Sequence, residues 1–486
     1  MSRRDKKSLV YHSIWDPIEL GKYLNEKHCI KLWLYLIKNS YSNTVVSDIH
    51  DIPFESLKLP LRSIPDIKTN FLLFTSKIDE TFHSNRGDTT KLVIKLQDNH
   101  KIETVIMNHA HRNTVCLSSQ IGCAMGCKFC ATGSMGIIGD LTCGEIIEQF
   151  YYANRISKIR NVVFMGMGEP LNNYNNVLEA LKFLTDTKRY NLSPRHITVS
   201  TVGIIKNIYK LTEDMPMVNL ALSLHAPNQD IRLQIVPTAT NYHIDKLMEA
   251  IDHYIANSKN NKKHKLNNNN NNSNIINNDY NDDNDDDDNV SSNISNEREN
   301  GSNISSCEKT SLLPRRTSVM IEYILIKDIN DRPEHAKQLG ELLILNDRRY
   351  HVLLNLIPYN PTDTCEDFHP PLQEDIKQFN DILIKFPYNI HTRIRQEMGQ
   401  DIAGACGQLV VKANKIQKEL VDVEDITLAN TKSAKNSKVK SKNKVESIGN
   451  IYSYRFPSIF STVAFSMGFG FISFMLYKLS RNRIKA

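Results

Sequence analysis

The sequence has 486 residues, of which 40% are hydrophobic and 23% charged, a composition typical of a globular protein with solvated segments. Its nine cysteines are too few for the disulfide framework of a small secreted protein. The net charge is +6, but residues 266–308 hold ten acidic side chains and one arginine, so the rest carries +15. A basic body with an acidic insertion fits a nucleic-acid partner, or simply a basic soluble enzyme.

The N-terminal sequence MSRRDKKSLVYHS has no apolar core and is therefore not a signal peptide. Its four basic residues and one acid are weak support for an organelle transit peptide. Residues 1–95 mix apolar runs with polar breaks, and we expect them to form a small, mostly helical accessory domain.

From about residue 96 the pattern alternates between short apolar runs and amphipathic stretches, which predicts buried strands joined by helices. The expected strands are Asn161–Met165, Ile197–Ser200, Leu220–Leu224, Val319–Leu325 and Val352–Ile357, and the expected helices are Cys143–Ala153, Val177–Thr185, Ile244–Ile255 and Ala336–Leu345. This order predicts an α/β fold with a parallel sheet or barrel, whose chemistry lies at the C-terminal ends of the strands. We assign residues 96–427 to this catalytic core.

Three segments depart from the alternating pattern. Residues 258–315 are rich in Asn and Asp and cannot bury a core, so we interpret them as a disordered surface insertion without catalytic role. Residues 428–455 form a basic linker. Phe456–Tyr477 has 22 residues without a charge, and about 20 apolar residues suffice for a helix to cross a bilayer. The sequence thus predicts a C-terminal transmembrane anchor, with a buried terminal helix as the alternative.

The strongest motif is the loop Cys123-Ala-Met-Gly-Cys127-Lys-Phe-Cys130, because soft thiolates at this spacing select an iron–sulfur cluster or zinc. Three ligands leave one iron of a four-iron cluster open to chelate a cofactor. A zinc site that uses Cys143 or a later histidine is the alternative. Either site requires a reducing compartment, since the thiolates must stay free to bind metal.

This spacing is the signature of the radical S-adenosylmethionine superfamily, and the chain resembles its RlmN-type RNA adenine-C2 methyltransferases. The resemblance covers residues 96–415 apart from the insertion, through CLSSQIGCAMGCKFCATGSMG, NVVFMGMGEPLNNYNNV, ITVSTVG, LALSLHAPNQDIR, NLIPYNP and DIAGACGQL. It implies a partial (β/α)6 TIM-like barrel, a [4Fe-4S] cluster held by the three cysteines, and S-adenosylmethionine. It also implies that the N-terminal domain contacts RNA.

The resemblance further implies roles for individual residues. The residues that would line the cofactor site are Gly168, Glu169, Ser200, Ser223, Leu224, His225 and Asn355. Cys406 would accept a methyl group, a 5′-deoxyadenosyl radical would remove one of its hydrogens, and the resulting carbon radical would add to adenine. Cys116 would then release the product by forming a disulfide with Cys406, and Glu103 is the candidate proton acceptor.

Radical chemistry suits this target because adenine C2 is electron-poor and resists a methyl-cation donor. The expected product is C2-methyladenosine in large-subunit rRNA, tRNA or both. The alternatives are C8 methylation, as in the related Cfr-type enzymes, and a membrane-tethered RNA-binding protein without catalysis. We expect a monomer, reduced by a ferredoxin- or flavodoxin-type protein, with its catalytic body in the cytoplasm and its C-terminal helix in a membrane. The interior of a mitochondrion or plastid is the alternative location.

Overall fold

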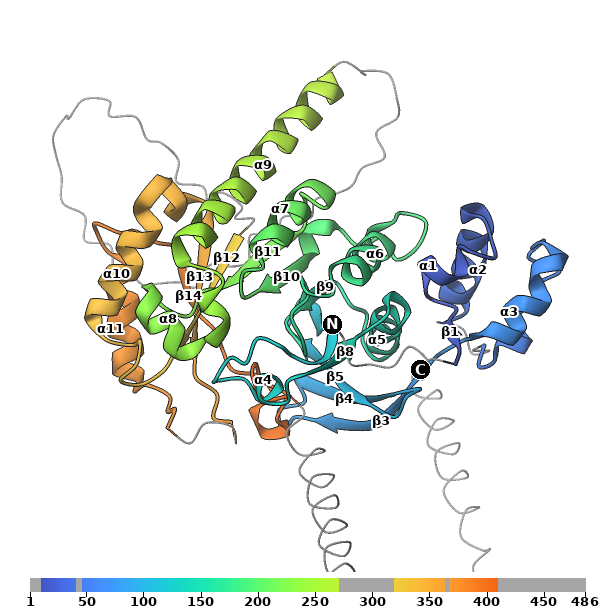
Figure 1. Ribbon diagram of the computed structural model, residues 1–486, viewed down its shortest axis with the longest axis horizontal. Coiled ribbons are helices and arrows are strands. Elements are labelled where there is room, and N and C mark those ends of the chain that lie inside the picture. The colour runs from blue at the N-terminus through green and yellow to red at the C-terminus, as the bar shows by residue number, and fades with distance from the viewer. Residues whose placement is uncertain (1–9, 41–45, 271–318, 363–366, 410–486) are drawn as a thin grey trace, which may run out of the picture. The chain divides into compact units, whose positions relative to one another are not determined.

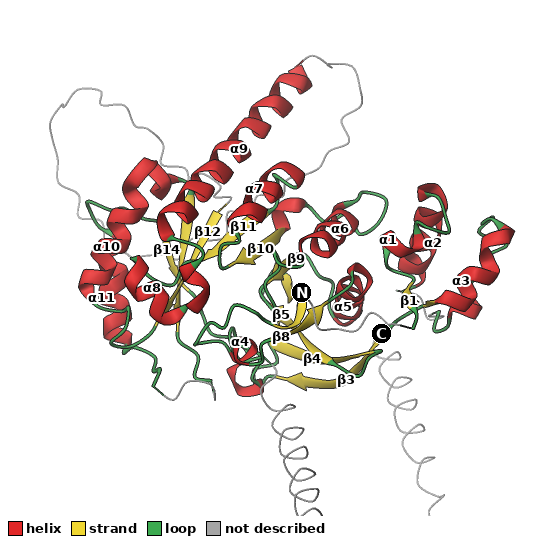
Figure 2. Ribbon diagram, in the orientation of Figure 1, coloured by secondary structure: helices red, strands yellow, loops and turns green. Residues whose placement is uncertain are grey.

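The computed structural model describes residues 10–40, 46–270, 319–362 and 367–409. Their centre is a ten-stranded sheet in the order β14-β13-β12-β11-β10-β9-β6-β5-β4-β3, with helices packed outside it (Figures 1 and 2). Every neighbouring pair from β6 to β14 is parallel, and every pair from β3 to β6 is antiparallel. The sheet therefore combines a parallel half and an antiparallel half that meet at β6.

The parallel half forms the partial barrel that the family resemblance implies. Its strands are β6 (Asn113–Cys116), β9 (Asn161–Phe164), β10 (Ile197–Thr201), β11 (Asn219–Ser223), β12 (Val319–Leu325), β13 (Val352–Pro358) and β14 (Thr392–Ile394). The helices between them are α4 (Ala131–Ser134), α5 (Cys143–Ile156), α6 (Tyr174–Thr185), α7 (Ile205–Asp214), α8 (Gln229–Ile235), α9 (Ile244–Asn270), α10 (Pro333–Ile344) and α11 (Gln373–Ile384). All five predicted strands and all four predicted helices are confirmed; β6, β14, α4, α7, α8 and α11 are additional.

Local sequence explains why these elements form where they do. Helix α5 begins with a capping box, in which Thr142 and Glu145 bond each other's backbone N–H groups. Strands β12 and β13 are almost wholly buried, which accounts for their continuous apolar runs. Glu322 and Asn355 are buried polar residues within these apolar runs, and they are register partners on the two strands.

The antiparallel half corrects the predicted domain boundary at residue 95. Strands β3 (Ser76–His83), β4 (Thr89–Leu96) and β5 (Lys101–Asn108) all belong to the large sheet, and residue 95 lies inside β4. The error arose because β3 is exposed along seven of its eight residues and so lacks the alternating apolar pattern of a half-buried strand. Its pairing with β4 decides its conformation.

The helical part of the N-terminal region is shorter than expected. It comprises α1 (Pro17–Leu20), α2 (Glu26–Asn39) and α3 (Ile64–Asn70), with the two-residue strands β1 (His12–Ser13) and β2 (Phe71–Leu72). Trp33 of α2 stacks edge-on against Phe183 of α6, with ring centroids 5.0 Å apart. Glu148 of α5 accepts hydrogen bonds from Ser13, Thr75 and Ser76. These helices thus share one hydrophobic core with the barrel.

The insertion and the tail are described only in small part. Helix α9 continues to Asn270, so the first residues of the segment 258–315 are helical, and α9 extends beyond the strands (Figure 1). The remainder of the insertion, the basic linker and Phe456–Tyr477 lie outside the described residues. Within the described ranges, no helix is long and apolar enough to span a bilayer.

Candidate active site

The loop that carries Cys123, Cys127 and Cys130 follows β7 (Gln120–Gly122), which pairs with β8 (Ile137–Asp140). Its turns depend on glycine: Gly122 and Gly126 have φ of +73° and +63°. A Cβ on Gly133 would lie 3.0 Å from the carbonyl oxygen of Cys127 and 3.1 Å from its nitrogen. The backbone of the cysteine loop is therefore tightly packed against itself.

These thiols fit an iron–sulfur cluster. Burial raises the pKa of Cys123 to about 12 and also raises the pKa values of Cys127 and Cys130, so the thiolates need a bound metal to persist. In the described part of the chain, no three His, Cys, Asp or Glu side chains converge as around a single metal ion. Thiols that each ligate a different iron of a cluster need not converge in that way.

The zinc alternative finds no support in the position of Cys143. This thiol is fully buried at the start of α5, and its charged neighbours are Asp16, Glu179 and Arg189 rather than the loop cysteines. It therefore belongs to the core between the N-terminal region and the barrel.

The C-terminal segment places Cys406 beside this loop. The Ala131 N–H donates to the carbonyl oxygen of Gly407 at 2.7 Å, and Asn360 Nδ2 donates to the carbonyl oxygen of Cys406 at 3.1 Å. Desolvation of the sulfur by the surrounding cavity walls raises the pKa of the Cys406 thiol; the positive charge of Arg395 opposes this shift and Cys130 adds to it. Cys406 is therefore close to the last cluster cysteine.

Cys116 and Cys406 line one cavity of about 670 Å³ in the interior of the barrel. Cys116 ends β6 and is buried, whereas Cys406 is exposed to the cavity. Burial raises the pKa of Cys116 to about 12, and the proximity of Cys406 adds to this rise. Both cysteines are free thiols. The cavity therefore brings together two of the residues that the resemblance assigns to the reaction.

A buried carboxylate and an arginine lie in the same cavity. Asn355 Nδ2 donates to Glu322 Oε1 at 2.8 Å, and Arg395 Nη1 lies 3.9 Å from Glu322 Oε2. Glu322 Oε2 is buried and has no hydrogen-bond partner among the described residues. The carbonyl oxygen of Glu322 also accepts from the N–H groups of Leu224 and His225. Glu322 therefore connects three of the expected cofactor residues.

Gly168 and Glu169 lie after β9, in a tight turn. Gly168 has a φ of +97°, and the Glu169 N–H donates to Gln120 Oε1 at 2.9 Å. The Glu169 carboxylate accepts from the N–H groups of Leu171 and Val202, at 3.0 and 2.9 Å, and burial raises its pKa to about 7. The Thr201 side chain also bonds to this carboxylate, and Glu169 thus fixes the ends of β9 and β10.

The other expected cofactor residues lie across adjacent strands. Ser200 Oγ and Ser223 Oγ are 3.3 Å apart, and Ser223, Glu322 and Asn355 are register partners on β11, β12 and β13. His225 has a φ of +60°, and its Nδ1 accepts from the Ile324 N–H at 3.1 Å. Burial, and secondarily Arg232, lowers the pKa of His225 to about 3, so the ring is neutral.

Glu103 lies on β5, two residues from the register partner of Cys116 and on the same face of the sheet. Its side chain is buried, and Lys91 Nζ lies 3.3 Å from its Oε1. The structure thus places Glu103 beside the barrel interior, although it is not one of the residues that line the cavity with Cys116 and Cys406.

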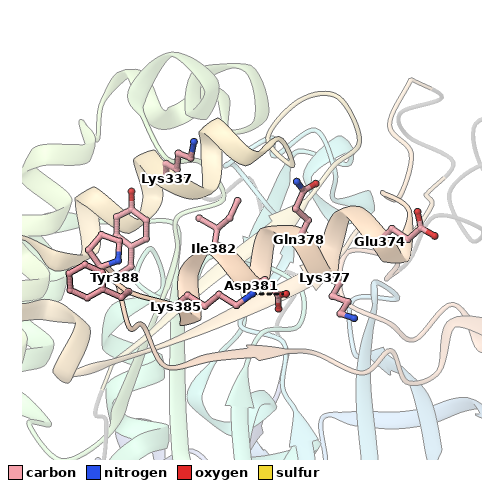
Figure 3. Close-up of a pocket in the computed structure, with 10 residues that line it drawn as sticks. Lys337, Glu374, Lys377, Gln378, Asp381, Ile382, Lys385 and Tyr388 are labelled. Carbon is pink, nitrogen blue, oxygen red and sulfur yellow. Dashed lines mark hydrogen bonds and ion pairs between the residues drawn. The ribbon is translucent and has the colours of Figure 1, made fainter.

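A second cavity, of about 630 Å³, lies between α10 and α11 (Figure 3). Its walls include Lys337, Lys377 and Lys385, and Lys385 pairs with Asp381 at 3.2 Å. No residue expected to be functional lies there. The barrel interior is therefore the candidate site.

Sequence reasoning missed several residues of the site, including Lys91, Arg232 and Glu322. Arg232 is fully buried and donates to the carbonyl oxygens of Leu224, Tyr242 and Val202. One signal was available for Glu322, because it is the single charged residue in the apolar run VMIEYIL. Lys91 and Arg232 gave no comparable signal.

Comparison with known proteins agrees with this geometry. Residues 117–267 match the Radical SAM superfamily. A probable dual-specificity RNA methyltransferase RlmN from Clostridium novyi is 35% identical over 345 residues, which cover 71% of this chain and 82% of the relative. One with the same name from Listeria welshimeri is 33% identical over 420 residues, covering 84% and 95%.

A solved structure shares the fold as well as the sequence. The crystal structure of a radical SAM methyltransferase from Sphaerobacter thermophilus has a TM-score of 0.61 and 29% sequence identity. The match covers 83% of this chain and 98% of that one. Together with the cysteine loop, the two cavity cysteines and the partial barrel, these matches show that the chain belongs to the RlmN family of radical S-adenosylmethionine methyltransferases.

Proposed function

We propose that this enzyme methylates C2 of adenosine in large-subunit rRNA, tRNA or both. The observation that carries this proposal is the position of Cys406, which lies beside Cys130 of the cluster loop and shares a cavity with Cys116. The relatives' name, dual-specificity RNA methyltransferase, supports RNA as the substrate.

Cys123, Cys127 and Cys130 would hold a [4Fe-4S] cluster, and this cluster would bind S-adenosylmethionine. The cluster and this cofactor supply the radical that activates a carbon for attack on adenine. In our proposal, Gly168, Glu169, Ser200, Ser223, Leu224, His225 and Asn355 hold the cofactor.

The remaining roles belong to side chains that face the RNA. Cys406 carries the transferred carbon and so keeps it beside its target, which reduces the entropic cost of the reaction. The adduct radical gives up one electron to a one-electron acceptor, for which we propose the oxidised cluster, and Glu103 accepts the proton that C2 loses. The Cys116 thiolate attacks the sulfur of Cys406 and forms the disulfide, while the S–C bond breaks; the carbon leaves with the bonding electron pair and takes up a proton, which releases the base with a methyl group. Two electrons from a reductant, for which we propose a ferredoxin- or flavodoxin-type protein, restore the thiols.

Basic side chains around the cavity support an RNA substrate. Arg112, Arg195, Arg393 and Arg395 line it, against the two carboxylates Glu322 and Glu397. Cationic side chains neutralise phosphates and release their counterions, which gives salt-dependent affinity. A base must leave its stack to reach the barrel interior, so we propose that the adenosine is flipped out of the RNA.

The test uses anaerobically reconstituted full-length protein, S-adenosylmethionine, a reductant and unmodified rRNA or tRNA. Nucleoside mass spectrometry is expected to detect 2-methyladenosine. Cys406→Ala should abolish it, and Cys116→Ala should leave protein covalently attached to RNA. Detection of 8-methyladenosine would favour C8 chemistry instead. Absence of both products, in protein that holds its cluster, would favour the RNA-binding alternative.

We further propose that Phe456–Tyr477 anchors a monomeric enzyme to a membrane, with its catalytic body in the cytoplasm. The length and lack of charge of this segment support the proposal. A fluorescent fusion of the full chain is expected to sediment with membranes, whereas one that ends at residue 450 should not. If both are equally soluble, the anchor proposal is wrong; if both enter an organelle, the alternative location is favoured.

A further inference from the structure

Lys91 of β4 connects the antiparallel half of the sheet to the loop that carries Cys406. Its ammonium nitrogen lies 3.3 Å from Glu103 Oε1 and donates to the carbonyl oxygen of Ala403, also at 3.3 Å. The side chains of Lys91 and Glu103 are 8% and 7% exposed, so solvent hardly screens this ion pair. The buried ammonium group of Lys91 therefore contacts both the Glu103 carboxylate and the carbonyl group of Ala403, which lies three residues before Cys406.

The backbone around Ala403 needs such an external contact. Ala403 has a φ of +49°, a left-handed conformation that a residue with a Cβ rarely adopts unless its surroundings impose it. Two further contacts join this loop to the β3–β4 hairpin. The Asn85 N–H donates to Asp401 Oδ2 at 2.7 Å, and a Cβ on Gly399 would lie 2.7 Å from Thr89 Cγ2. The β3–β4 hairpin thus packs against residues 399–404 and supports their conformation.

The side chains of Lys91, Glu103 and Cys116 share one face of the sheet. Lys91 pairs in register with Val105, so Glu103 is its diagonal neighbour on the same face of the sheet. On the next strand, Val105 pairs with Cys116. Lys91, Glu103 and Cys116 therefore face the same side of three adjacent strands, toward the loop of Cys406.

We propose that Lys91 is a positioning residue, which fixes the Glu103 carboxylate relative to Cys406 so that both act on one adenine. This inference rests on the proposed function, in which Glu103 accepts the proton and Cys406 carries the carbon. If Lys91 is lost, the carboxylate keeps its burial but loses its charge partner, and the loop loses its anchor. Misplacement of reacting groups by about 1 Å can cost on the order of a hundredfold in rate.

The first experiment measures the anchor itself and does not depend on activity. Amide hydrogen exchange of residues 399–407 is compared in the reconstituted full-length wild type, Lys91→Met, Lys91→Arg and Lys95→Met. Lys95 is the matched control, because it lies on the same strand and face but pairs in register with Lys101. We expect faster exchange in Lys91→Met alone, with Lys91→Arg close to the wild type because it retains the charge and the donors.

The second experiment separates the two stages of the reaction in a single turnover. Mass spectrometry measures the fraction of Cys406 that carries a methyl group, and nucleoside analysis measures methylated adenosine. For Lys91→Met we expect methylated Cys406 at wild-type levels and RNA methylation slowed about tenfold or more, as for a misplaced general base. Lys91→Arg should recover most of this loss, and Lys95→Met should show none.

Two results would overturn the proposal. One is that Lys91→Met shows the same amide hydrogen exchange in residues 399–407 and the same RNA methylation as the wild type. The other is a parallel fall of melting temperature, cluster content, methylated Cys406 and RNA product, without recovery in Lys91→Arg, since this would indicate a purely structural lysine. If the wild type makes no methylated adenosine, the proposed function fails, while the exchange comparison still decides whether Lys91 anchors the loop.

Discussion

The N–H of Ala131 donates a 2.7 Å hydrogen bond to the carbonyl oxygen of Gly407, so the residue after the last cluster cysteine is bonded to the residue after Cys406. Thr132 Oγ1 adds a longer contact, 3.5 Å, to the carbonyl oxygen of Leu409. Two segments far apart in the sequence are thereby held side by side, and their relative position is set mainly by backbone groups. A substitution that crowds the backbone of either segment should therefore disturb the site.

Gly133→Ala should reduce the cluster content of the protein. The new Cβ would lie 3.0 and 3.1 Å from backbone atoms of Cys127, and a backbone cannot move aside as a flexible side chain can. Crowding of this kind typically costs about 1–3 kcal/mol. Iron and sulfide per chain after anaerobic reconstitution are expected to fall below wild-type values.

Gly404→Ala is the matched control for that experiment. A Cβ there would be 3.4 Å from its nearest neighbour, the carbonyl oxygen of Gly399, which is about ordinary contact. Its iron content should equal that of the wild type. Equal iron content in Gly133→Ala would contradict the idea that the tight backbone packing of the loop is needed to hold the cluster.

Glu148→Gln should loosen the N-terminal region. The carboxylate accepts from the Ser13 and Thr75 hydroxyls and the Thr75 N–H through one oxygen, and from the Ser76 N–H and hydroxyl through the other. Glutamine replaces one carboxylate oxygen by an NH2 group. The N–H donors of this group would then point at other hydrogen-bond donors. An unsatisfied buried polar group costs about 1–3 kcal/mol, so the melting temperature should fall. Glu179→Gln, at a partly exposed site, should melt like the wild type.

His225 should make the fold less stable at mildly acidic pH. Its pKa is lowered to about 3, chiefly by burial and secondly by Arg232, so between pH 6.5 and 3 only the unfolded chain is protonated there. The stability that neutral His225 contributes is therefore present above pH 6.5 and declines as the pH falls. Between pH 6.5 and 5 the loss is about 2 kcal/mol.

His225→Asn should remove that part of the pH dependence. Asparagine tolerates the φ of +60° and can accept from the Ile324 N–H, but it does not titrate. Denaturant unfolding at pH 7 and pH 5 is expected to show a smaller loss of stability in the variant than in the wild type. Equal losses in the two proteins would show that His225 is not the titrating group.

Replacement of residues 260–316 by a short Gly–Ser linker should leave catalysis intact. Tyr254 Oη donates to the carbonyl oxygen of Val218 at 2.8 Å and so fixes α9 to the barrel before the replaced segment, while β12 is held by pairing on both sides. Loop-closure entropy depends only weakly on length, so stability should change by less than about 1 kcal/mol. A large drop in RNA methylation, with melting unchanged, would instead give the insertion a role in the reaction.

The sequence predicted the parallel half of the sheet well, and for a physical reason. Buried parallel strands are continuous apolar runs, and β12 has the predicted bounds of Val319–Leu325. The cysteine loop was equally readable because its ligands are neighbours in the sequence. Lys91 was not, because its contact with Ala403 joins residues 312 positions apart, and its neighbourhood exists only after the sheet has formed. The polar strand β3 was missed for a similar reason.

The distance along the chain between the cluster loop and Cys406 also matters for the order of events during protein synthesis. A nascent chain that has emerged only as far as β14 already contains Cys123, Cys127 and Cys130 and every strand of the sheet, but not Cys406. If iron were loaded at that stage, such a chain would generate radicals with no thiol to receive the carbon, and the damage would fall on the polypeptide itself. Maturation of the metal centre should therefore follow the synthesis of the segment that carries Cys406.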